Sequence, residues 1–325
     1  MATTDPPSTT RTGPSSRRSV WGILMANGLY RAITGTVLAT PRRQFIVLAA
    51  FPILWILAAN VGPIVSMARI GFLDSYPPAV GHVPTFTLDN FLRFFQNDIF
   101  RVPFFRTLGF AFVLTAVTLV ITYPVAYFLA KHVRRDNQLR FLLLVLIPFW
   151  VGEIVRTYAI MILLGNNGAV NLVLKYLGLI DRPIPFMYTT FSLSFGIIYL
   201  TALYMLLPLY SALEKIPRNL AESAADLGAG PWARFWRITL PLSREGIASG
   251  STLVFLLATG YYATPVLLGG PSTTLFSETI AGFFHVAGDQ WPTGAAFATI
   301  MLVTALAITG IFLKLMGRSG KGMMQ

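Results

Sequence analysis

The sequence contains no cysteine and few charged residues, and both scarcities limit what the protein can do. With no cysteine among its 325 residues, disulfide bonds, cysteine-ligated zinc and thiol catalysis are excluded. The three histidines, His82, His132 and His285, lack the spacing of metal ligands, so we expect no metal site. Charged residues make up 12% of the chain and hydrophobic residues 54%, whereas a typical soluble domain is about 25% charged. This composition is typical of a membrane protein.

The sequence also lacks two common signals. No short apolar core follows a basic start near the N-terminus, so we expect no secretory signal peptide. Instead, residues 1–44 are predicted to form a basic cytoplasmic tail, disordered at first, with a surface helix over 21–40. No Walker A sequence occurs, because "GRSGKG" near the C-terminus has neither the spacing nor the Ser/Thr after Lys.

Apolar residues are gathered into long runs. A helix needs roughly 20 apolar residues to cross a bilayer, and six runs qualify: 45–68, 104–130, 140–164, 191–211, 247–268 and 294–316. We therefore predict an all-α, polytopic membrane domain over 45–316, followed by a cytoplasmic tail over 317–325. Most of these runs contain a proline, namely Pro52, Pro124, Pro148, Pro208 and Pro265, which indicates kinked helices packed in a bundle.

Basic residues show which ends of the runs face the cytoplasm. Lys and Arg concentrate before the first run, between the second and third, between the fourth and fifth, and after the sixth. The positive-inside rule therefore places both termini in the cytoplasm. The outer segments carry balanced charge, so the net charge of +12 reflects membrane topology. We accordingly expect no nucleic-acid binding.

The longest inner segment, 212–246, contains the polar stretch "ESAADLGAGPWARFWRITLP" at 222–241. We predict one short helix from after Pro217 to Gly228, and a second from Pro231 to just before Pro241. Trp232, Phe235 and Trp236 are expected to form an apolar face. Local physics leaves two interpretations open, a hairpin resting on lipid headgroups or a docking site for a soluble partner.

The same stretch resembles the EAA motif of the permease subunits of binding-protein-dependent ABC importers. The residues in register with the motif are Glu222, Ala224, Gly228, Ile238, Leu240 and Pro241. Ser223 replaces the first alanine of the motif by another small residue. The resemblance implies the type I ABC importer permease fold, in which this loop is a coupling helix seated in a groove of the ATPase. It assigns Glu222 as a polar anchor or helix-start charge, Gly228 as the bend and the apolar face as the part that fills the groove.

The resemblance also implies partners. In this family a cytoplasmic ABC ATPase dimer hydrolyses ATP with Mg²⁺, so this chain would be a transport subunit that is not itself an enzyme and holds no cofactor. The pore would be completed by a second homologous permease, giving a heterodimer, and a periplasmic solute-binding protein would deliver a small-molecule solute. The protein would reside in the bacterial inner membrane, among its lipids.

The resemblance extends over about residues 45–315 and is strongest to the permeases of spermidine/putrescine transporters. The stretches that carry it are "IPFWVGEIVRTYAIMILLGNNGAVN", "LGLIDRPIPFMYT", "ATPVLLGGP" and "DQWPTGAA". It implies a small, polar, cationic solute such as a polyamine. An ABC permease for another organic solute, such as an opine or amino-acid derivative, stays open, as do a stand-alone secondary transporter and a membrane enzyme.

Charged and aromatic residues inside the predicted spans are the candidates for the solute path. An ionisable residue costs about 2.5–3.5 kcal/mol at the centre of a membrane helix, and Glu153 and Arg156 both fall in the third run. Their i,i+3 spacing allows an ion pair on one helix face. The pair would either brace the bundle or let Glu153 meet a cationic amine, with Arg156 fixing its orientation. Aromatic rings can also hold an alkylammonium, and the candidates are Trp150, Tyr158, Tyr261 and Tyr262.

The predicted outer loops, 69–103, 165–190 and 269–293, are long enough to form a docking surface. "NNGAVNLVLKYLG" and "SETIAGFFHVAGDQWP" are each predicted to contain a short helix. Asp289, Trp291 and Pro292 are expected to fix a turn at the start of the last span.

Overall fold

The computed structural model describes residues 41–78, 81, 83–285 and 290–321. Within these residues the structure is helical, apart from turns, loops and one isolated bridge between Leu73 and Phe86. The predicted all-α fold class is confirmed. Residues 1–40 of the predicted tail, with the surface helix over 21–40, and Asp289 lie outside the described residues, while residues 41–44 belong to a helix.

Most of the helices follow one another with short connections, and longer connections run over 72–88 and 177–189. In chain order they are α3 (Pro41–Gly71), α4 (Asp89–Gln96), α5 (Asp98–Lys131), α6 (Arg135–Leu146), η2 (Ile147–Trp150), α7 (Glu153–Leu164), α8 (Ala169–Tyr176), α9 (Thr190–Lys215), α10 (Arg218–Asp226), α11 (Pro231–Arg234), η3 (Phe235–Thr239), α12 (Leu240–Leu242), α13 (Arg244–Gly260), α14 (Ala263–Leu268), η4 (Pro271–Thr273), α15 (Phe276–His285) and α16 (Trp291–Lys321). The short helices predicted in the outer loops correspond to α8 and α15.

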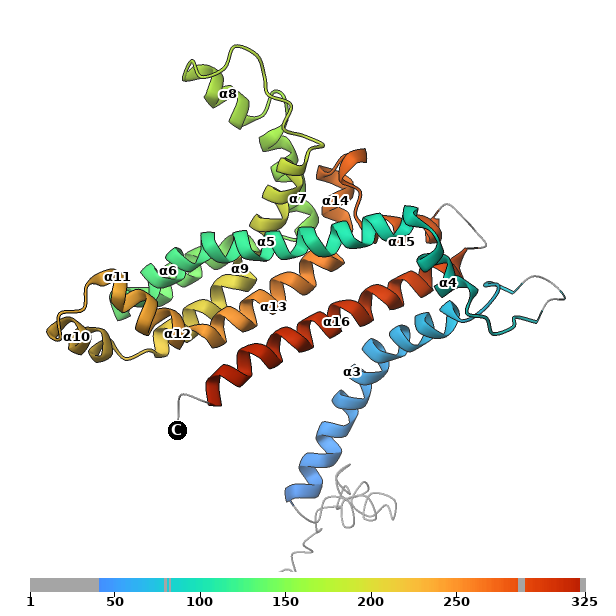
Figure 1. The fold of residues 1–325 in the computed structure, drawn as a ribbon, viewed down its shortest axis with the longest axis horizontal. Coiled ribbons are helices and arrows are strands. Elements are labelled where there is room, and N and C mark those ends of the chain that lie inside the picture. Colours follow the sequence, from blue (N-terminus) through green and yellow to red (C-terminus); the bar gives the residue numbers. More distant parts are fainter. Residues whose placement is uncertain (1–40, 79–80, 82, 286–289, 322–325) are drawn as a thin grey trace, which may run out of the picture. The chain divides into compact units, whose positions relative to one another are not determined.

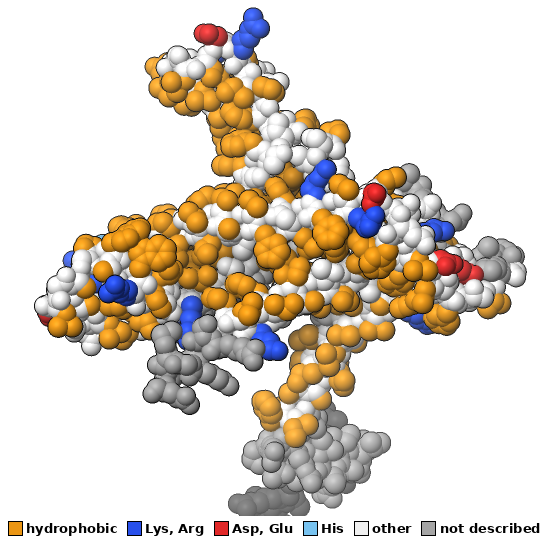
Figure 2. All heavy atoms as spheres, in the orientation of Figure 1, with side chains coloured by type: hydrophobic (Ala, Val, Ile, Leu, Met, Phe, Trp, Pro, Cys, Tyr) orange, Lys and Arg blue, Asp and Glu red, His pale blue; other side chains and the backbone are white. Residues whose placement is uncertain are grey.

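The chain divides into two units, one ending at Ser66 and the other beginning at Met67. The first unit contains most of α3, an apolar helix with Pro52 and Pro63 inside it. The second unit contains a helical bundle in which α9 packs against both α5 and α13, while α16 lies along α13 (Figure 1). Figure 2 shows hydrophobic side chains covering most of the visible face of this bundle, as expected for helices in contact with lipid.

Helix α9 is the centre of the bundle. Its side chains Leu193, Ile197, Leu200, Leu209 and Leu213 are fully buried. Together with Leu203 and Leu206, which are also buried, they recur every three or four residues and form the stripe that an α-helix presents to a neighbour. One end of this stripe belongs to a core shared by α4, α5, α13, α15 and α16, and the other to a core shared by α5, α6 and α13.

Small residues allow α13 to approach α9 closely. Gly246 and Gly250 form a GxxxG pattern on α13, which is a common contact motif between membrane helices. A Cβ added at Gly250 would lie 2.7 Å from the sulfur of Met205 on α9. The two backbones therefore pack at a distance that a larger side chain does not permit.

Five segments within the described residues are long and apolar enough to cross a membrane: Leu48–Gly71, Asp98–Lys131, Glu153–Tyr176, Thr190–Lys215 and Trp291–Met316. They account for five of the six predicted spans, although the third begins later than predicted. The predicted span 247–268 is not among them because the chain leaves the helix at Tyr261 and Tyr262, which separates α13 from α14. Helix α13 has only 17 residues, below the roughly 20 needed for a full crossing. The count of six is therefore not confirmed.

The predicted span 140–164 is also not one helix. It comprises most of α6, then η2, an extended pair at Val151 and Gly152, and finally α7. Pro148 lies in η2, where its missing N–H prevents a regular helix from continuing. The break places Glu153 at the beginning of α7.

Candidate coupling loop and solute path

Two parts of the structure contain the residues selected from the sequence. The first is the loop from Ile216 to Ser243, which joins α9 to α13 and is called the coupling loop below. The second is the region where the break before α7 meets the break between α13 and α14.

Gly228 ends the first helix of the coupling loop. Helix α10 starts at Arg218, directly after Pro217, and its end is closed by two hydrogen bonds. Gly228 N–H donates to the Ala225 carbonyl at 2.8 Å, and Ala229 N–H donates to the Ala224 carbonyl at 2.9 Å. This pattern is a Schellman cap, and it requires the positive φ of +85° that Gly228 adopts. The predicted start, stop and bend of this helix are confirmed.

The second half of the coupling loop begins as predicted and ends later than predicted. Pro231 starts α11, but the helical path continues through the π-turn η3 and through α12, past Pro241. The predicted end before Pro241 is therefore wrong. In η3 the Leu240 N–H donates to the Phe235 carbonyl, so the helical turn before Pro241 is wider than a regular α-helical turn.

The rings of Trp232, Phe235 and Trp236 contact one another, as expected for the predicted apolar face. Trp232 and Trp236 are 73% and 51% exposed, and Leu227 at the tip is 88% exposed. Phe235 is half-buried and also packs edge-on against Tyr123 and Tyr127 of α5. Leu227, Trp232 and Trp236 are therefore the exposed part of this apolar surface, and Phe235 joins it to the bundle.

Buried hydrogen bonds attach the coupling loop to the bundle. The Tyr123 hydroxyl on α5 lies 2.9 Å from the Ser243 hydroxyl, which also donates to the Leu240 carbonyl at 3.0 Å. Lys131 at the end of α5 donates to the Ile216 carbonyl at 2.6 Å. These bonds join both ends of the loop to α5, so the loop is positioned to move with the bundle.

The six motif residues lie on different sides of the loop. Ile238, Leu240 and Pro241 are half-buried, and Leu240 packs against the core. Ala224 is half-buried, whereas Glu222 and Gly228 are exposed. Glu222 also lines a cavity of about 280 Å³, together with Arg218 and Arg234. The motif thus combines residues that hold the loop in place with residues that face outward.

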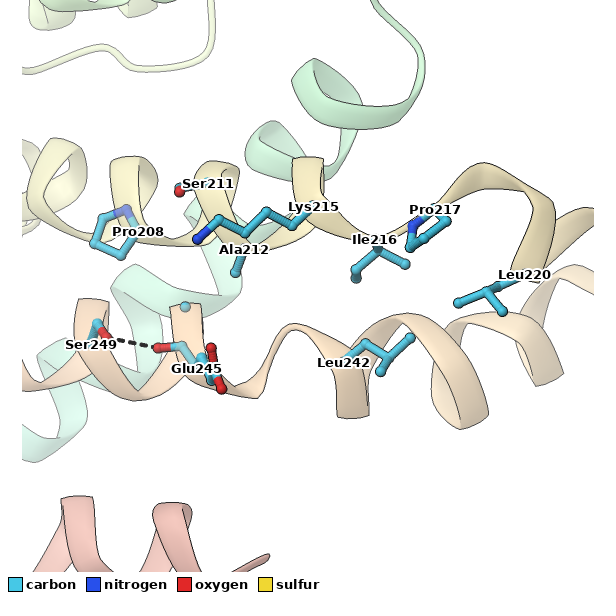
Figure 3. Close-up of a pocket in the computed structure, with 11 residues that line it drawn as sticks. Pro208, Ser211, Ala212, Lys215, Ile216, Pro217, Leu220, Leu242, Glu245 and Ser249 are labelled. Carbon is cyan, nitrogen blue, oxygen red and sulfur yellow. Dashed lines mark hydrogen bonds between the residues drawn. The ribbon is translucent and has the colours of Figure 1, made fainter. Parts of the chain in front are cut away.

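A larger cavity of about 460 Å³ lies beside the coupling loop (Figure 3). It separates the end of α9 and the start of α10 from α12 and the start of α13, and Lys215 and Glu245 line it from opposite helices. The Ser249 hydroxyl donates to the Glu245 carbonyl at 2.8 Å. The cavity leaves the outer side of the loop without close support from the bundle.

The predicted pair of Glu153 and Arg156 is not formed. Within the described part of the chain, no ion pair joins these two residues. The Arg156 guanidinium carbon lies 4.9 Å from the centre of the Phe149 ring, an arrangement that favours cation–π attraction. Glu153 Oε1 accepts a long hydrogen bond of 3.4 Å from the Thr264 hydroxyl of α14. The partner of Arg156 is therefore the Phe149 ring of η2, and not the Glu153 carboxylate.

Tyr261 joins this region to the break between α13 and α14. Its side chain is buried, and it interacts electrostatically with Glu153, Arg156 and Tyr204. Tyr204 packs edge-on against Phe149 at 5.0 Å between ring centres. The sequence did not single out Phe149, Tyr204 or Thr264. The sequence gives little indication of a functional role for them, since aromatic and hydroxyl side chains within apolar runs are most often packing residues.

The remaining aromatic candidates are not gathered around Glu153. Trp150 is 90% exposed, and Tyr158 and Tyr262 are about half exposed. Tyr262 stacks on His285 of α15. Arg156 lines a cavity of about 400 Å³ whose other walls include Pro148, Phe149 and Tyr199. Of the six candidates, the structure therefore brings together Glu153, Arg156 and Tyr261.

Proteins with similar sequences identify the family of this chain. The spermidine/putrescine transport system permease protein PotB of Escherichia coli (strain K12) is 36% identical over 236 residues, which cover 73% of this chain and 83% of that protein. The chain belongs to the family of ABC importer permease subunits. PotB of Haemophilus influenzae is 35% identical over 222 residues, covering 68% of this chain and 76% of that permease. The inner membrane ABC transporter permease protein YdcU of Escherichia coli (strain K12) is 27% identical over 298 residues, covering 88% and 93% of the two chains. No family model matches the chain.

Solved structures of ABC importers share the permease fold. A bacterial ABC transporter involved in the import of the acidic polysaccharide alginate aligns with a TM-score of 0.62 at 20% identity, covering 85% of this permease and 96% of that chain. The alginate transporter in complex with an alginate pentasaccharide-bound periplasmic protein aligns with a TM-score of 0.65 at 19% identity, with the same coverage. These likenesses confirm the predicted permease fold.

Proposed function

We propose that this permease subunit moves a polyamine such as spermidine or putrescine across the inner membrane. The observation that carries the proposal is the 36% identity to spermidine/putrescine permeases over 236 residues. The region around Glu153 fits a cationic solute, because its carboxylate interacts electrostatically with the buried aromatic side chain of Tyr261. Trp150, Tyr158 and Tyr262 would line other parts of the path.

The energy for transport comes from ATP that a separate ATPase dimer hydrolyses with Mg²⁺. The coupling loop is the part of the permease that contacts it. Leu227, Trp232 and Trp236 form an exposed apolar face of the kind that fills a groove on a partner. Glu222 is the polar anchor at this contact, and the cap at Gly228 keeps α10 and α11 at a fixed angle. Ala224, Ile238, Leu240 and Pro241 hold the loop in shape, so that closure of the ATPase dimer moves the bundle.

Two other proteins complete the importer. A second, homologous permease forms the pore with this one, and a periplasmic solute-binding protein delivers the solute. Both termini of this chain lie in the cytoplasm, as the distribution of Lys and Arg indicates. That orientation places the coupling loop on the side of the membrane where ATP is available.

The proposal is tested by uptake into proteoliposomes that contain both permeases and the ATPase, with ATP enclosed and binding protein outside. We expect uptake of labelled spermidine or putrescine that stops when the ATPase is omitted. Transport of an opine or amino-acid derivative in place of polyamines would refute the substrate assignment. Uptake that continues without the ATPase would refute the coupling.

A further inference from the structure

Among the residues that the structure describes, no Lys or Arg side chain forms an ion pair with the carboxylate of Glu153. It is the only carboxylate within the predicted spans, and it is half-buried at the start of α7. Its side-chain hydrogen bond within the described residues is the one from Thr264 at 3.4 Å, which is too long to compensate a charge. A carboxylate within a membrane domain is costly unless it is paired, so its partner is expected to come from outside the chain.

The Arg156 guanidinium lies over the Phe149 ring and is not paired with the Glu153 carboxylate. Arg156 follows Glu153 by three residues on the same helix, a spacing at which opposite charges attract. Its guanidinium instead lies over the Phe149 ring, and that ring is held from the side by Tyr204. The Arg156 Nε atom is buried and has no hydrogen-bond partner. The ring therefore replaces Glu153 as the main neighbour of the Arg156 charge.

Other groups fix the direction of the carboxylate. Thr157, one turn after Glu153, donates to the Glu153 carbonyl at 3.0 Å, and its hydroxyl lies 3.4 Å from that of Thr264. Two helix breaks meet here, before α7 and after α13. Such interruptions in transport proteins line solute sites, because irregular backbone within a membrane is tolerated where it borders a cavity.

From these contacts we infer that Glu153 binds an ammonium group of the transported solute, with Phe149 as the positioning residue that prevents Arg156 from neutralising it. The inference rests on the proposed function and adds to it the residue that selects a cationic solute. Thr264 donates a hydrogen bond to the Glu153 carboxylate, and the buried ring of Tyr261 interacts with it electrostatically. Positive solutes would be favoured over neutral ones of the same size.

The test measures the KM and kcat of spermidine uptake by the complete importer in proteoliposomes. We expect Glu153→Gln to raise KM about tenfold or more, since a charged hydrogen bond is lost, and Glu153→Asp to raise it less. Ile162→Leu, at an exposed position on the same helix, is the matched control and should leave KM unchanged.

The positioning role of Phe149 has its own test. Phe149→Leu should also raise KM, because Arg156 is then free to pair with Glu153. Adding Arg156→Gln to Phe149→Leu should restore KM toward the wild-type value, whereas adding Arg156→Lys should not. A purely structural role for Phe149 would give no such rescue, and that result would overturn its assignment.

The outcomes separate this inference from the proposed function. Wild-type uptake of spermidine with an unchanged KM in Glu153→Gln would overturn the inference alone. Loss of assembled importer in Glu153→Gln, with normal KM in the remaining complexes, would show that a cation of the second permease is the partner, and would also overturn it. A wild-type importer that takes up no polyamine would refute both.

Discussion

A Cβ added at Gly246 of α13 would lie 2.6 Å from the carbonyl oxygen of Pro208 on α9. Pro208 is within α9, so this close approach occurs beside a helix whose hydrogen-bond pattern is already interrupted. The contact is adjacent to the coupling loop, because α13 begins only two residues before Gly246. Packing of α13 on α9 therefore determines where the loop enters the bundle.

We predict that Gly246→Ala destabilises the permease by about 1–3 kcal/mol, the usual cost of overpacking a tight contact. The thermal unfolding midpoint of the purified protein in detergent measures this effect. Gly109→Ala in α5 is the control, because a Cβ at that position meets nothing within 4 Å. Equal midpoints for the two variants would contradict the close packing of α13 on α9.

Gly228→Val should weaken ATPase association and uptake. A branched residue at the φ of +85° costs at least about 1–2 kcal/mol, and the cap of α10 would open. Gly228→Asn should retain more activity, since asparagine tolerates this conformation. No neighbouring atom lies within 4 Å of a Cβ at Gly228, so only the backbone distinguishes the two variants. Identical losses in both would argue against a role for the cap.

Trp232→Ala should affect ATPase binding, whereas Phe235→Ala should affect stability. Trp232 is 73% exposed, so its truncation should leave the unfolding midpoint unchanged and weaken ATPase binding by about 1–2 kcal/mol or more. Phe235 packs against Tyr123 and Tyr127, so its truncation should lower the unfolding midpoint. Co-purification of the ATPase and thermal unfolding together measure both effects. Normal ATPase binding by Trp232→Ala would exclude this face as the contact.

Ser243→Ala should cost more stability than Tyr123→Phe. Removing the Ser243 hydroxyl leaves the buried Tyr123 hydroxyl without the partner at 2.9 Å, at a cost of about 1–3 kcal/mol. Removing the Tyr123 hydroxyl leaves Ser243 bonded to the Leu240 carbonyl, so about 0.5–1.5 kcal/mol is expected. Thermal unfolding of both variants gives the order, and the reverse order would show that this bond contributes little.

The coupling loop illustrates how far local sequence determines structure. Pro217, Gly228 and Pro231 specify one helix start, one stop and a second start through their own backbone preferences, and all three positions are confirmed. The end of the second helix was missed because the π-turn before Pro241 depends on packing against α5, which short-range propensity does not describe.

Helical periodicity alone could not decide which aromatic side chains of the loop face outward. Trp232, Phe235 and Trp236 are three and four residues apart, so they share one face, and their rings contact one another. Phe235 is less exposed than the two tryptophans because it also contacts Tyr123 and Tyr127, more than 100 positions earlier in the chain. A similar long-range effect placed Thr264 beside Glu153.

The sequence by itself determined the helical membrane fold, the location of the coupling loop and its family, because apolar runs, Gly and Pro act locally and the motif is contiguous. Only the tertiary structure decided that Arg156 lies over Phe149, and that Tyr261 and Thr264 approach Glu153. Spacing permits an ion pair between Glu153 and Arg156, but the choice between a carboxylate and an aromatic ring is made by how η2, α7 and α9 pack. That packing energy is a sum over residues distant in sequence, so no single segment encodes it.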